Sequence, residues 1–387
     1  MEAYLDNAAT TKVFPEVREK MVQVLEQDFG NPSSKHTKGM EAEQYIREAR
    51  ETIAKTLKCQ PGEIVFTSGG TEANNMALIG AAMANKRAGN HIITTRIEHA
   101  SIHETLAFLE EQGFSVTYLP VDEMGHLSID RIREALTPET IIVSVMYVNN
   151  EMGAIQNIQE IAESVHENNS GTLFHVDAIQ AYGKYQIIPK RLGIDLMSVS
   201  GHKLHGPKGT GFLYVRDRAK IRPILYGGGQ QKGFRPGTEN VPGIAGMGEA
   251  IRIMAKRREE NVEHLYQCKE RFLKGLQALE GVSVNGTKFD DFRESAPHIV
   301  SVSFEGIRSE VLLHALAEKG IYVSSGSACS SNHPELSGTL KAIHVPQQLL
   351  DSTLRFSFSV DTKTEEIVYA LEQLQELLPA LRRFVRH

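Results

Sequence analysis

The chain has 387 residues, with 42 Lys and Arg against 48 Asp and Glu, so its formal net charge is −6 at pH 7. This length is enough for two domains, or for one large domain with an appendage. The acidic balance gives no reason to expect nucleic acid as a ligand. No apolar run approaches the ~18 residues of a membrane-spanning helix, so no membrane association is expected.

The cysteines and the N-terminus bear on the cellular compartment. Residues 1–6 lack a basic stretch followed by an apolar one, so we expect no signal peptide. The three cysteines, Cys59, Cys268 and Cys329, are far apart in the sequence and odd in number. A disulfide framework or a zinc site built on paired cysteines is therefore not expected, and the pattern predicts a cytoplasmic protein.

Short β-branched segments alternate with amphipathic helical segments over the first two-thirds of the chain. This alternation predicts an α/β fold, with a mostly parallel seven-stranded sheet between layers of helices. In such sheets, ligands bind outside the carboxyl ends of the strands. The expected strands are residues 64–67, 91–95, 115–119, 141–146, 172–176, 194–199 and 211–215, and the helices between them are 38–57, 72–86, 101–112 and 158–167.

The pattern changes after the glycine cluster at residues 227–229. There we expect a smaller α+β domain, joined to the first through a long charged helix. The resulting division gives a large domain at 14–255 and a small domain formed by 1–13 and 256–387. The expected elements are a helix at about 244–280, strands at 299–304, 321–324 and 354–359, and helices at 310–319 and 364–385.

A lysine follows the expected strand at 194–199, in the sequence Ser200-Gly201-His202-Lys203. Asp177 ends an earlier apolar segment. A lone lysine after a strand is more often structural, but its pairing with a carboxylate fits pyridoxal 5′-phosphate. That cofactor needs a lysine to form a Schiff base with its aldehyde, and a carboxylate to keep its ring nitrogen protonated.

Residues 68–71, Ser-Gly-Gly-Thr, join an expected strand to an expected helix. The backbone N–H groups at a helix N-terminus, with the hydroxyl of Thr71 beside them, form an anion site suited to a phosphate. The same sequence also fits a simple turn with an N-cap. Ser200 and His202, on the turn that leads to the lysine, can supply further donors to the same phosphate.

His99 lies just after the expected strand at 91–95. It could be a satisfied polar residue at a strand end, or half of a metal-binding pair with His103. A metal would need further ligands, and Cys329 is the only candidate of the right type, so no metal site is expected. An imidazole that stacks on a flat cofactor ring and moves a proton fits the position better.

Cys329 lies in a segment rich in serine, which is not typical of a core strand. An accessible thiol there suits nucleophilic or redox chemistry, and the composition of residues 325–339 predicts a mobile loop. Arg355 has apolar neighbours in an expected strand. A buried arginine needs a carboxylate, which can be that of a substrate or that of an internal Asp or Glu.

Together these motifs resemble those of the cysteine desulfurases, which are class V, fold-type I pyridoxal-phosphate enzymes. The resemblance covers nearly the whole chain. One departure is Pro236, where the family usually has serine in the motif Arg-Ser-Gly-Thr. The sequence of residues 330–335 also differs from the one common in the family. The matching segments are 4–11, 30–34 with His36, 67–75, 98–99, 148–153, 175–180, 200–211, 227–230, 235–238, 325–329 and 354–357.

The resemblance implies a role for each candidate residue. Cys329 would be the nucleophile, with a transient iron–sulfur ligand role left open, and His99 and Lys203 would be catalytic with it. Asn150 and Arg355 would hold the substrate carboxylate. The cofactor would be bound by Lys203 and Asp177, by Gln180 at the ring hydroxyl, by His99 stacked on the ring, by Asn150, and at the phosphate by Gly70, Thr71, Ser200, His202 and Thr238, the last from the partner subunit of a homodimer.

The implied reaction converts L-cysteine to L-alanine and leaves the sulfur on Cys329 as a persulfide. A sulfur-acceptor protein, such as an iron–sulfur scaffold or a tRNA-thiolation enzyme, would then receive it. The alternatives are a selenocysteine lyase or another class V aminotransferase, and the thiol argues against a plain aminotransferase. A non-catalytic scaffold is a further alternative, against which the complete set of Lys203, Asp177, His99 and Cys329 argues.

Overall fold

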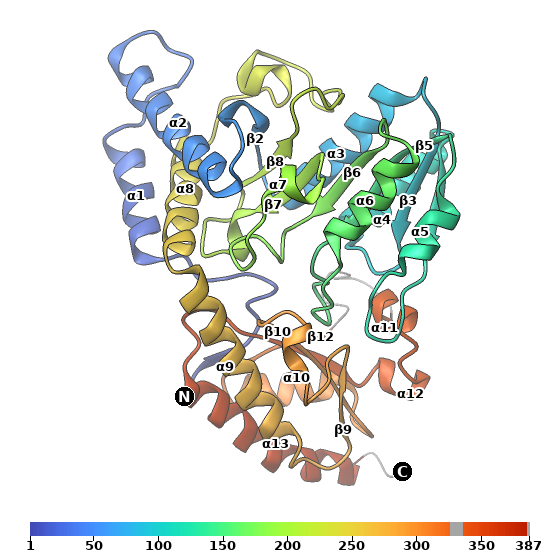
Figure 1. The fold of residues 1–387 in the computed structure, drawn as a ribbon. Helices are drawn as coiled ribbons and strands as arrows, with labels where there is room; N and C mark the ends of the chain where they lie inside the picture. The colour runs from blue at the N-terminus through green and yellow to red at the C-terminus, as the bar shows by residue number, and fades with distance from the viewer. Residues whose placement is uncertain (326–335, 385–387) are drawn as a thin grey trace.

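The computed structural model describes residues 1–325 and 336–384, and a seven-stranded sheet forms the centre of its larger part (Figure 1). Neighbouring strands are parallel except where β8 pairs with β2 and with β7. The predicted mostly parallel sheet of seven strands is therefore confirmed. In spatial order the strands are β2 (Ile64–Thr67), β8 (Gly211–Val215), β7 (Leu196–Ser200), β6 (Leu173–Asp177), β5 (Thr140–Met146), β3 (His91–Thr95) and β4 (Ser115–Leu119).

Helices cover both faces of this sheet, because successive strand side chains point to opposite sides. Ile64 and Phe66 of β2 belong to one apolar core, whereas Val65 between them belongs to another. The first core includes α1 (Pro15–Glu26), α2 (Thr37–Leu57), α5 (Ile129–Ala135), α6 (Ile158–Asn168) and α8 (Val241–Lys256). The second includes α3 (Gly70–Asn85) and α4 (Ala100–Glu111). Burial on both faces explains the β-branched strand sequences.

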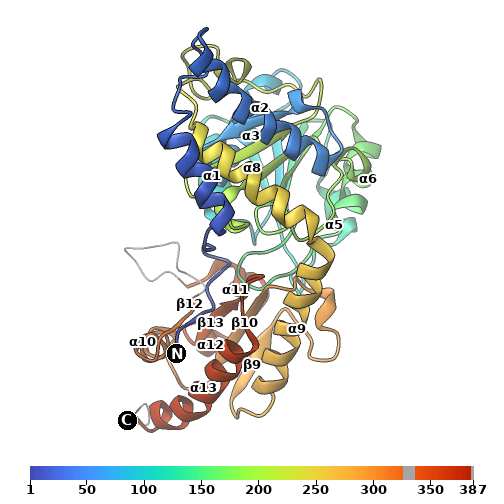
Figure 2. The same cartoon turned by 90° about the vertical axis from the view of Figure 1, so that its left-hand side faces the viewer.

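A smaller part lies at one end of the molecule, where the N-terminal strand and the last helix meet (Figure 2). Its core contains Ala3 and Leu5 together with residues between 265 and 378. We propose the domain division 14–255 against 1–13 plus 256–387 on this basis. The elements are the antiparallel sheet β12 (Ser324–Ser325), β13 (Thr353–Ser357), β10 (Ile299–Phe304) and β9 (Val282–Asn285), the pair β1 (Ala3–Tyr4) and β11 (Ile321–Tyr322), and helices α9 (Arg258–Leu276), α10 (Ser309–Glu318) and α13 (Thr364–Phe384).

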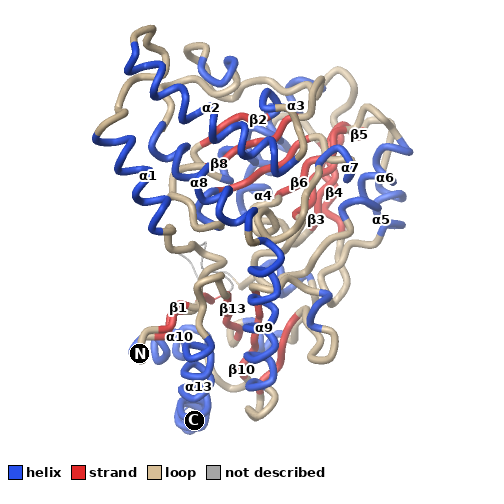
Figure 3. Tube along the Cα trace, turned by 60° about the vertical axis from the view of Figure 1, so that its left-hand side comes forward, coloured by secondary structure: helices blue, strands red, loops and turns tan. Residues whose placement is uncertain are grey.

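Two sequence expectations differ from the structure. The single helix expected at 244–280 is two helices, because Arg257 leaves the helical conformation, with φ −121° and ψ 20°. The break lets α8 pack on the large sheet and α9 on the small core (Figure 3). The strand expected at 321–324 is two short strands, since β11 pairs with β1 and β12 with β13. The sequence patterns also missed α1, α5, β9 and the short helices α7 (Pro189–Leu192), α11 (Gly338–Ala342) and α12 (Gln347–Leu350).

None of the helices in the described ranges is long and apolar enough to cross a membrane.

The small core offers a stability test at Phe272. This side chain is fully buried, and its ring centroid lies 4.7 Å from that of Phe356 and 5.7 Å from that of Phe358. Phe272→Ala should lower the free energy of unfolding by about 3–5 kcal/mol, because it removes buried apolar area and leaves a cavity. Urea denaturation measures the change. The control is Phe108→Ala on α4, where the ring is 42% exposed, and equal losses in the two variants would contradict the packing described here.

Candidate functional site

A cavity of about 320 Å³ lies at the carboxyl ends of β5, β6 and β7. It brings together most of the residues singled out in the sequence. Thr238 is exposed and does not line this cavity, and Cys329 lies outside the described residues. The lining includes Gly70, Thr71, His99, Asn150, Asp177, Gln180, Ser200, His202, Lys203 and Arg355.

Lys203 ends the short 3₁₀ turn that follows β7. Its Nζ donates hydrogen bonds to the carbonyl oxygens of Ala8, at 2.7 Å, and Ala9, at 2.6 Å. The main-chain N–H of Thr11 donates to the carbonyl of His202 at 2.9 Å, which ties the N-terminal segment to this turn. The ammonium group is therefore held over the cavity by backbone acceptors, which leave no signal in the sequence.

Asp177 ends β6 and is almost completely buried. Burial raises the pKa of its carboxyl group, and two donors oppose this by stabilising the anion. The main-chain N–H of Ile179 donates to Oδ1 and the Nδ2 of Asn74 donates to Oδ2, each at 2.9 Å. A carboxylate with these partners can interact with a protonated nitrogen of a ligand.

The turn before α3 adjoins the main cavity through a more open hollow of about 430 Å³, lined by Gly70, Thr71, Ser200 and His202. The first N–H groups of a helix have no partner within the helix and attract anions. Burial, assisted by the charge of Lys203, lowers the pKa of His202 to about 4, so this imidazole is neutral and can donate one hydrogen bond. These groups suit a phosphate.

Gly211 lets this hollow form. A Cβ atom at this position would lie 2.6 Å from the carbonyl oxygen of Val199 and 2.8 Å from the Cα of Gly69. Any other residue at position 211 would therefore push the turn at residues 68–71 away from β8.

His99 is the N-cap of α4. Its Nδ1 accepts a hydrogen bond from the main-chain N–H of Ser101 at 3.1 Å and lies 2.9 Å from the Oγ of the same residue. His103, the other half of the metal pair considered above, stacks on Tyr118 with ring centroids 5.8 Å apart. In the described ranges, no three His, Cys, Asp or Glu side chains are grouped to hold a metal ion.

Arg355, in β13, is buried and faces the cavity from the small part of the molecule. Its Nη2 contacts the Oδ1 of Asp6 at 3.0 Å, and its Nη1 donates to the carbonyl oxygen of Asn150 at 2.8 Å. The structure thus supplies the internal carboxylate that the sequence left open. The buried Nε has no hydrogen-bond partner among the described residues. Each Nη carries a second N–H beyond the one in these contacts, so donors are left for a ligand.

Gln180 makes two hydrogen bonds at the floor of the cavity. Its Nε2 donates to the carbonyl oxygen of Ala8 at 3.0 Å, and its Oε1 lies 3.1 Å from the Nε2 of His298. The pKa of His298 is held well below its usual range by burial and then by the charge of Lys184. The neutral imidazole of His298 can therefore donate to Gln180 and fix the orientation of its amide.

The segment expected to be a mobile loop, 325–339, is described only in part. Ser337 and Thr339 are buried, and the hydroxyl of Ser337 donates to Glu151. The expectation is therefore wrong for these last residues of the segment, which are anchored beside Asn150. Residues 326–335, which include Cys329, lie outside the described part of the chain.

The sequence interpretation missed three side chains that shape the site: Asp6, Asn74 and Ser101. Asn74 had the clearest signal in the sequence, because it is a polar residue between Ala73 and Ala77 in an expected helix, and in the structure it is fully buried. Such a residue needs a polar partner, and here that partner is Asp177.

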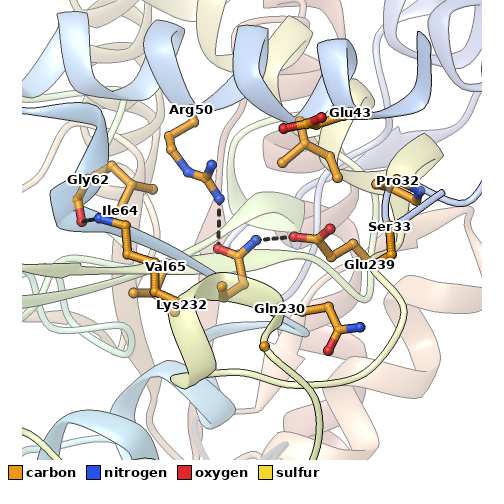
Figure 4. A pocket seen from close by; sticks show the side chains of 13 residues that line it. Pro32, Ser33, Glu43, Arg50, Gly62, Ile64, Val65, Gln230, Lys232 and Glu239 are labelled. Carbon is orange, nitrogen blue, oxygen red and sulfur yellow. Dashed lines mark hydrogen bonds between the residues drawn. The ribbon is translucent and has the colours of Figure 1, made fainter. Parts of the chain in front are cut away.

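A second cavity of about 320 Å³ lies between α2 and residues 229–232 (Figure 4). Its central polar groups are already paired with one another. Gln231 accepts a hydrogen bond from Arg50 at 2.9 Å and donates to Glu239, and Lys232 donates to the carbonyl oxygen of Gly62 at 3.2 Å. The first cavity, which holds the lysine, the buried carboxylate and an unpaired arginine donor, is the candidate active site.

Comparisons with known proteins agree with this choice. A protein of Clostridium botulinum called cysteine desulfurase IscS is 44% identical over 382 residues, which cover 98% of this chain and 95% of that protein. A solved structure described as a NifS-like protein has a TM-score of 0.92 and 37% identity, and covers 98% of this chain and 100% of its own. Another, SspA in complex with cysteine, has a TM-score of 0.80 and 35% identity, with 92% and 99% covered. The family model for class-V aminotransferases matches residues 3–369, and the chain therefore belongs to that family.

Proposed function

We propose that the protein is a cysteine desulfurase, which converts L-cysteine to L-alanine and keeps the sulfur. The observation that carries this proposal is that Lys203, Asp177 and Arg355 face one cavity. Together they supply an amine, a buried carboxylate and a spare donor for a substrate carboxylate. The relatives named above support the same activity.

The cofactor of the family is pyridoxal 5′-phosphate, and the cavity fits it. When bound, it supplies an aldehyde that links to amines and a protonated ring that takes up the electron pair released at Cα. Asp177 would hold the ring nitrogen proton, Gln180 the ring hydroxyl, and Lys203 the aldehyde carbon. The phosphate would lie in the open hollow at the start of α3, held by Gly70, Thr71, Ser200 and His202.

Arg355 and Asn150 orient the substrate. The guanidinium of Arg355 lines the cavity and is buried, and burial strengthens its attraction to the carboxylate of L-cysteine. The contact with Asp6 holds the guanidinium in place before the substrate arrives. The neutral amine of Lys203 then removes the Cα proton at Nζ, and the carbonyl oxygens of Ala8 and Ala9 accept hydrogen bonds from the resulting ammonium group.

Cys329 receives the sulfur. Its thiolate attacks the sulfur of the substrate, so that the carbon–sulfur bond breaks, a sulfur–sulfur bond forms, and the released carbon takes up a proton to become L-alanine. His99 would interact with the sulfur during this transfer. The other two thiols are unsuited to attack, because burial raises the pKa of Cys59 to about 12 and that of Cys268 to about 11.

The proposal includes a homodimer and a sulfur-acceptor protein. Thr238 is exposed and lies outside its own cavity, so a second copy can present it to the phosphate of the first. The large side chains of Phe29, Met40 and Tyr226 are 63–85% exposed, which suits an interface. The persulfide would pass to an iron–sulfur scaffold or a tRNA-thiolation enzyme. The free thiols of Cys59 and Cys268 fit a cytoplasmic setting.

Replacing Lys203 tests the cofactor site. Lys203→Ala should abolish the visible absorbance of the lysine-bound cofactor and lower turnover of L-cysteine roughly 10²–10⁴-fold, because the base at Cα is lost. Spectra and alanine release measure the two effects. Lys274→Ala, at a lysine whose side chain is 70% exposed, is the control and should change neither. A Lys203→Ala protein that keeps the parent absorbance and rate would refute the assignment.

Replacing Cys329 separates sulfur transfer from cofactor binding. Cys329→Ser should keep the bound cofactor but form no persulfide, because its hydroxyl is a poor nucleophile toward sulfur. Mass spectrometry of the protein after brief exposure to L-cysteine reads the added sulfur. Cys59→Ala and Cys268→Ala should still gain it. Persulfide on the Cys329→Ser protein, or its loss from the Cys268→Ala protein, would mean that the nucleophile is misassigned.

A further inference from the structure

A chain of hydrogen bonds connects Asp177 to His99 through two buried side chains. The Nδ2 of Asn74 lies 2.9 Å from the Oδ2 of Asp177 and also 2.9 Å from the Oγ of Ser101. That hydroxyl lies 2.9 Å from the Nδ1 of His99. The two groups expected on the ring nitrogen and on the ring face of the cofactor therefore share one network.

The direction of these hydrogen bonds follows from the donors and acceptors available. An ionised carboxylate can only accept, so the amide nitrogen of Asn74, and not its oxygen, must face Asp177. Both hydrogens of this nitrogen are then used, one toward Asp177 and one toward Ser101. The Ser101 oxygen accepts from Asn74, and its single O–H proton is left for the Nδ1 of His99.

The backbone adds a second donor to the same ring nitrogen. His99 is the N-cap of α4, and an N-cap side chain accepts from an N–H group in the first turn. Here the main-chain N–H of Ser101 points at Nδ1, at 3.1 Å. A nitrogen that accepts two hydrogen bonds must keep its lone pair, so a neutral imidazole has to bear its proton on Nε2.

We propose that Ser101 and Asn74 are positioning residues that hold His99 as its Nε2–H tautomer. This inference rests on the proposed function and refines it. A neutral His99 in this tautomer presents an N–H at Nε2, so it can donate a hydrogen bond there but cannot remove a proton. His99 then donates a hydrogen bond to an acceptor in the cavity, such as a sulfur atom, and the thiol proton of Cys329 must leave by another route.

The surroundings suit such a lock. Asn74 is fully buried in α3 and Ser101 is buried in α4, and the two helices pack against each other. Water does not compete for hydrogen bonds at these positions. The donor and acceptor roles that Asp177 imposes on Asn74 therefore also determine those of Ser101 and His99. The ionised state of Asp177 that holds the cofactor nitrogen is thus the state that fixes the histidine.

The tautomer can be read directly by NMR. The holoenzyme is deuterated except for its histidines, which carry ¹⁵N and keep their ring protons. The two-bond couplings between the carbon-bound ring protons and the ring nitrogens then show which nitrogen is protonated, and His99→Gln identifies the signal of His99. We expect the parent protein to show the Nε2–H pattern. A parent spectrum with the proton on Nδ1 would overturn the proposal.

Ser101→Ala tests the hydroxyl. It should give a mixture of tautomers and lower kcat about fivefold at unchanged KM, the effect of one lost hydrogen bond. Ser101→Thr retains the hydroxyl and should restore the parent pattern. An unchanged histidine signal in Ser101→Ala would contradict the role given to Ser101.

A matched control comes from the same helix. The Oγ1 of Thr105 is buried and donates to the carbonyl oxygen of Ser101 at 2.8 Å, not to His99. Thr105→Val should leave the histidine pattern unchanged, and a shift as large as that of Ser101→Ala would point to general loosening of α4. The spectra need no turnover, so a failed desulfurase assay would contradict the proposed function without changing the tautomer result. An unexpected tautomer would likewise contradict the role of Ser101 and Asn74 without changing the proposed function.

Discussion

The carboxylate of Asp177 is buried at the end of β6, where loss of water alone favours its neutral form. The N–H of Ile179 and the amide of Asn74 oppose this by stabilising the anion, each through a hydrogen bond of 2.9 Å. A cofactor ring can be held protonated only against such a charge. The same charge sets the direction of the hydrogen bonds that continue through Ser101 to His99.

A short N-terminal segment joins the two halves of the site. Its strand β1 pairs with β11 in the small part, and Asp6 contacts Arg355 on β13. Two residues further on, the carbonyl oxygens of Ala8 and Ala9 hold Lys203 on the large sheet. The segment runs between the two parts of the molecule (Figure 2), so the lysine that acts at Cα and the arginine that holds the carboxylate are set by one piece of chain.

The sequence predicted the features that depend on local pattern. The predicted bounds of the strands of the large sheet agree with the structure to within two residues, because burial on both faces favours runs of β-branched residues. The candidate site residues of the large part lie near the ends of those strands. The break at Arg257 was not predictable from the sequence, because it depends on tertiary packing: α8 packs in the core of the large part and α9 in the core of the small part. The hydrogen bonds that hold the Nζ of Lys203 could not be predicted from the sequence either, because their acceptors are main-chain carbonyl oxygens, which every residue has.

In the proposed reaction, sulfur leaves L-cysteine without oxidation of the carbon skeleton. The most direct test incubates the holoenzyme with L-cysteine and a thiol reductant, which releases the persulfide sulfur, and measures alanine, sulfide and keto acid together. We expect alanine and sulfide in equal amounts and no keto acid. A keto acid as the main carbon product, or alanine without an equal amount of sulfide, would contradict the proposed reaction.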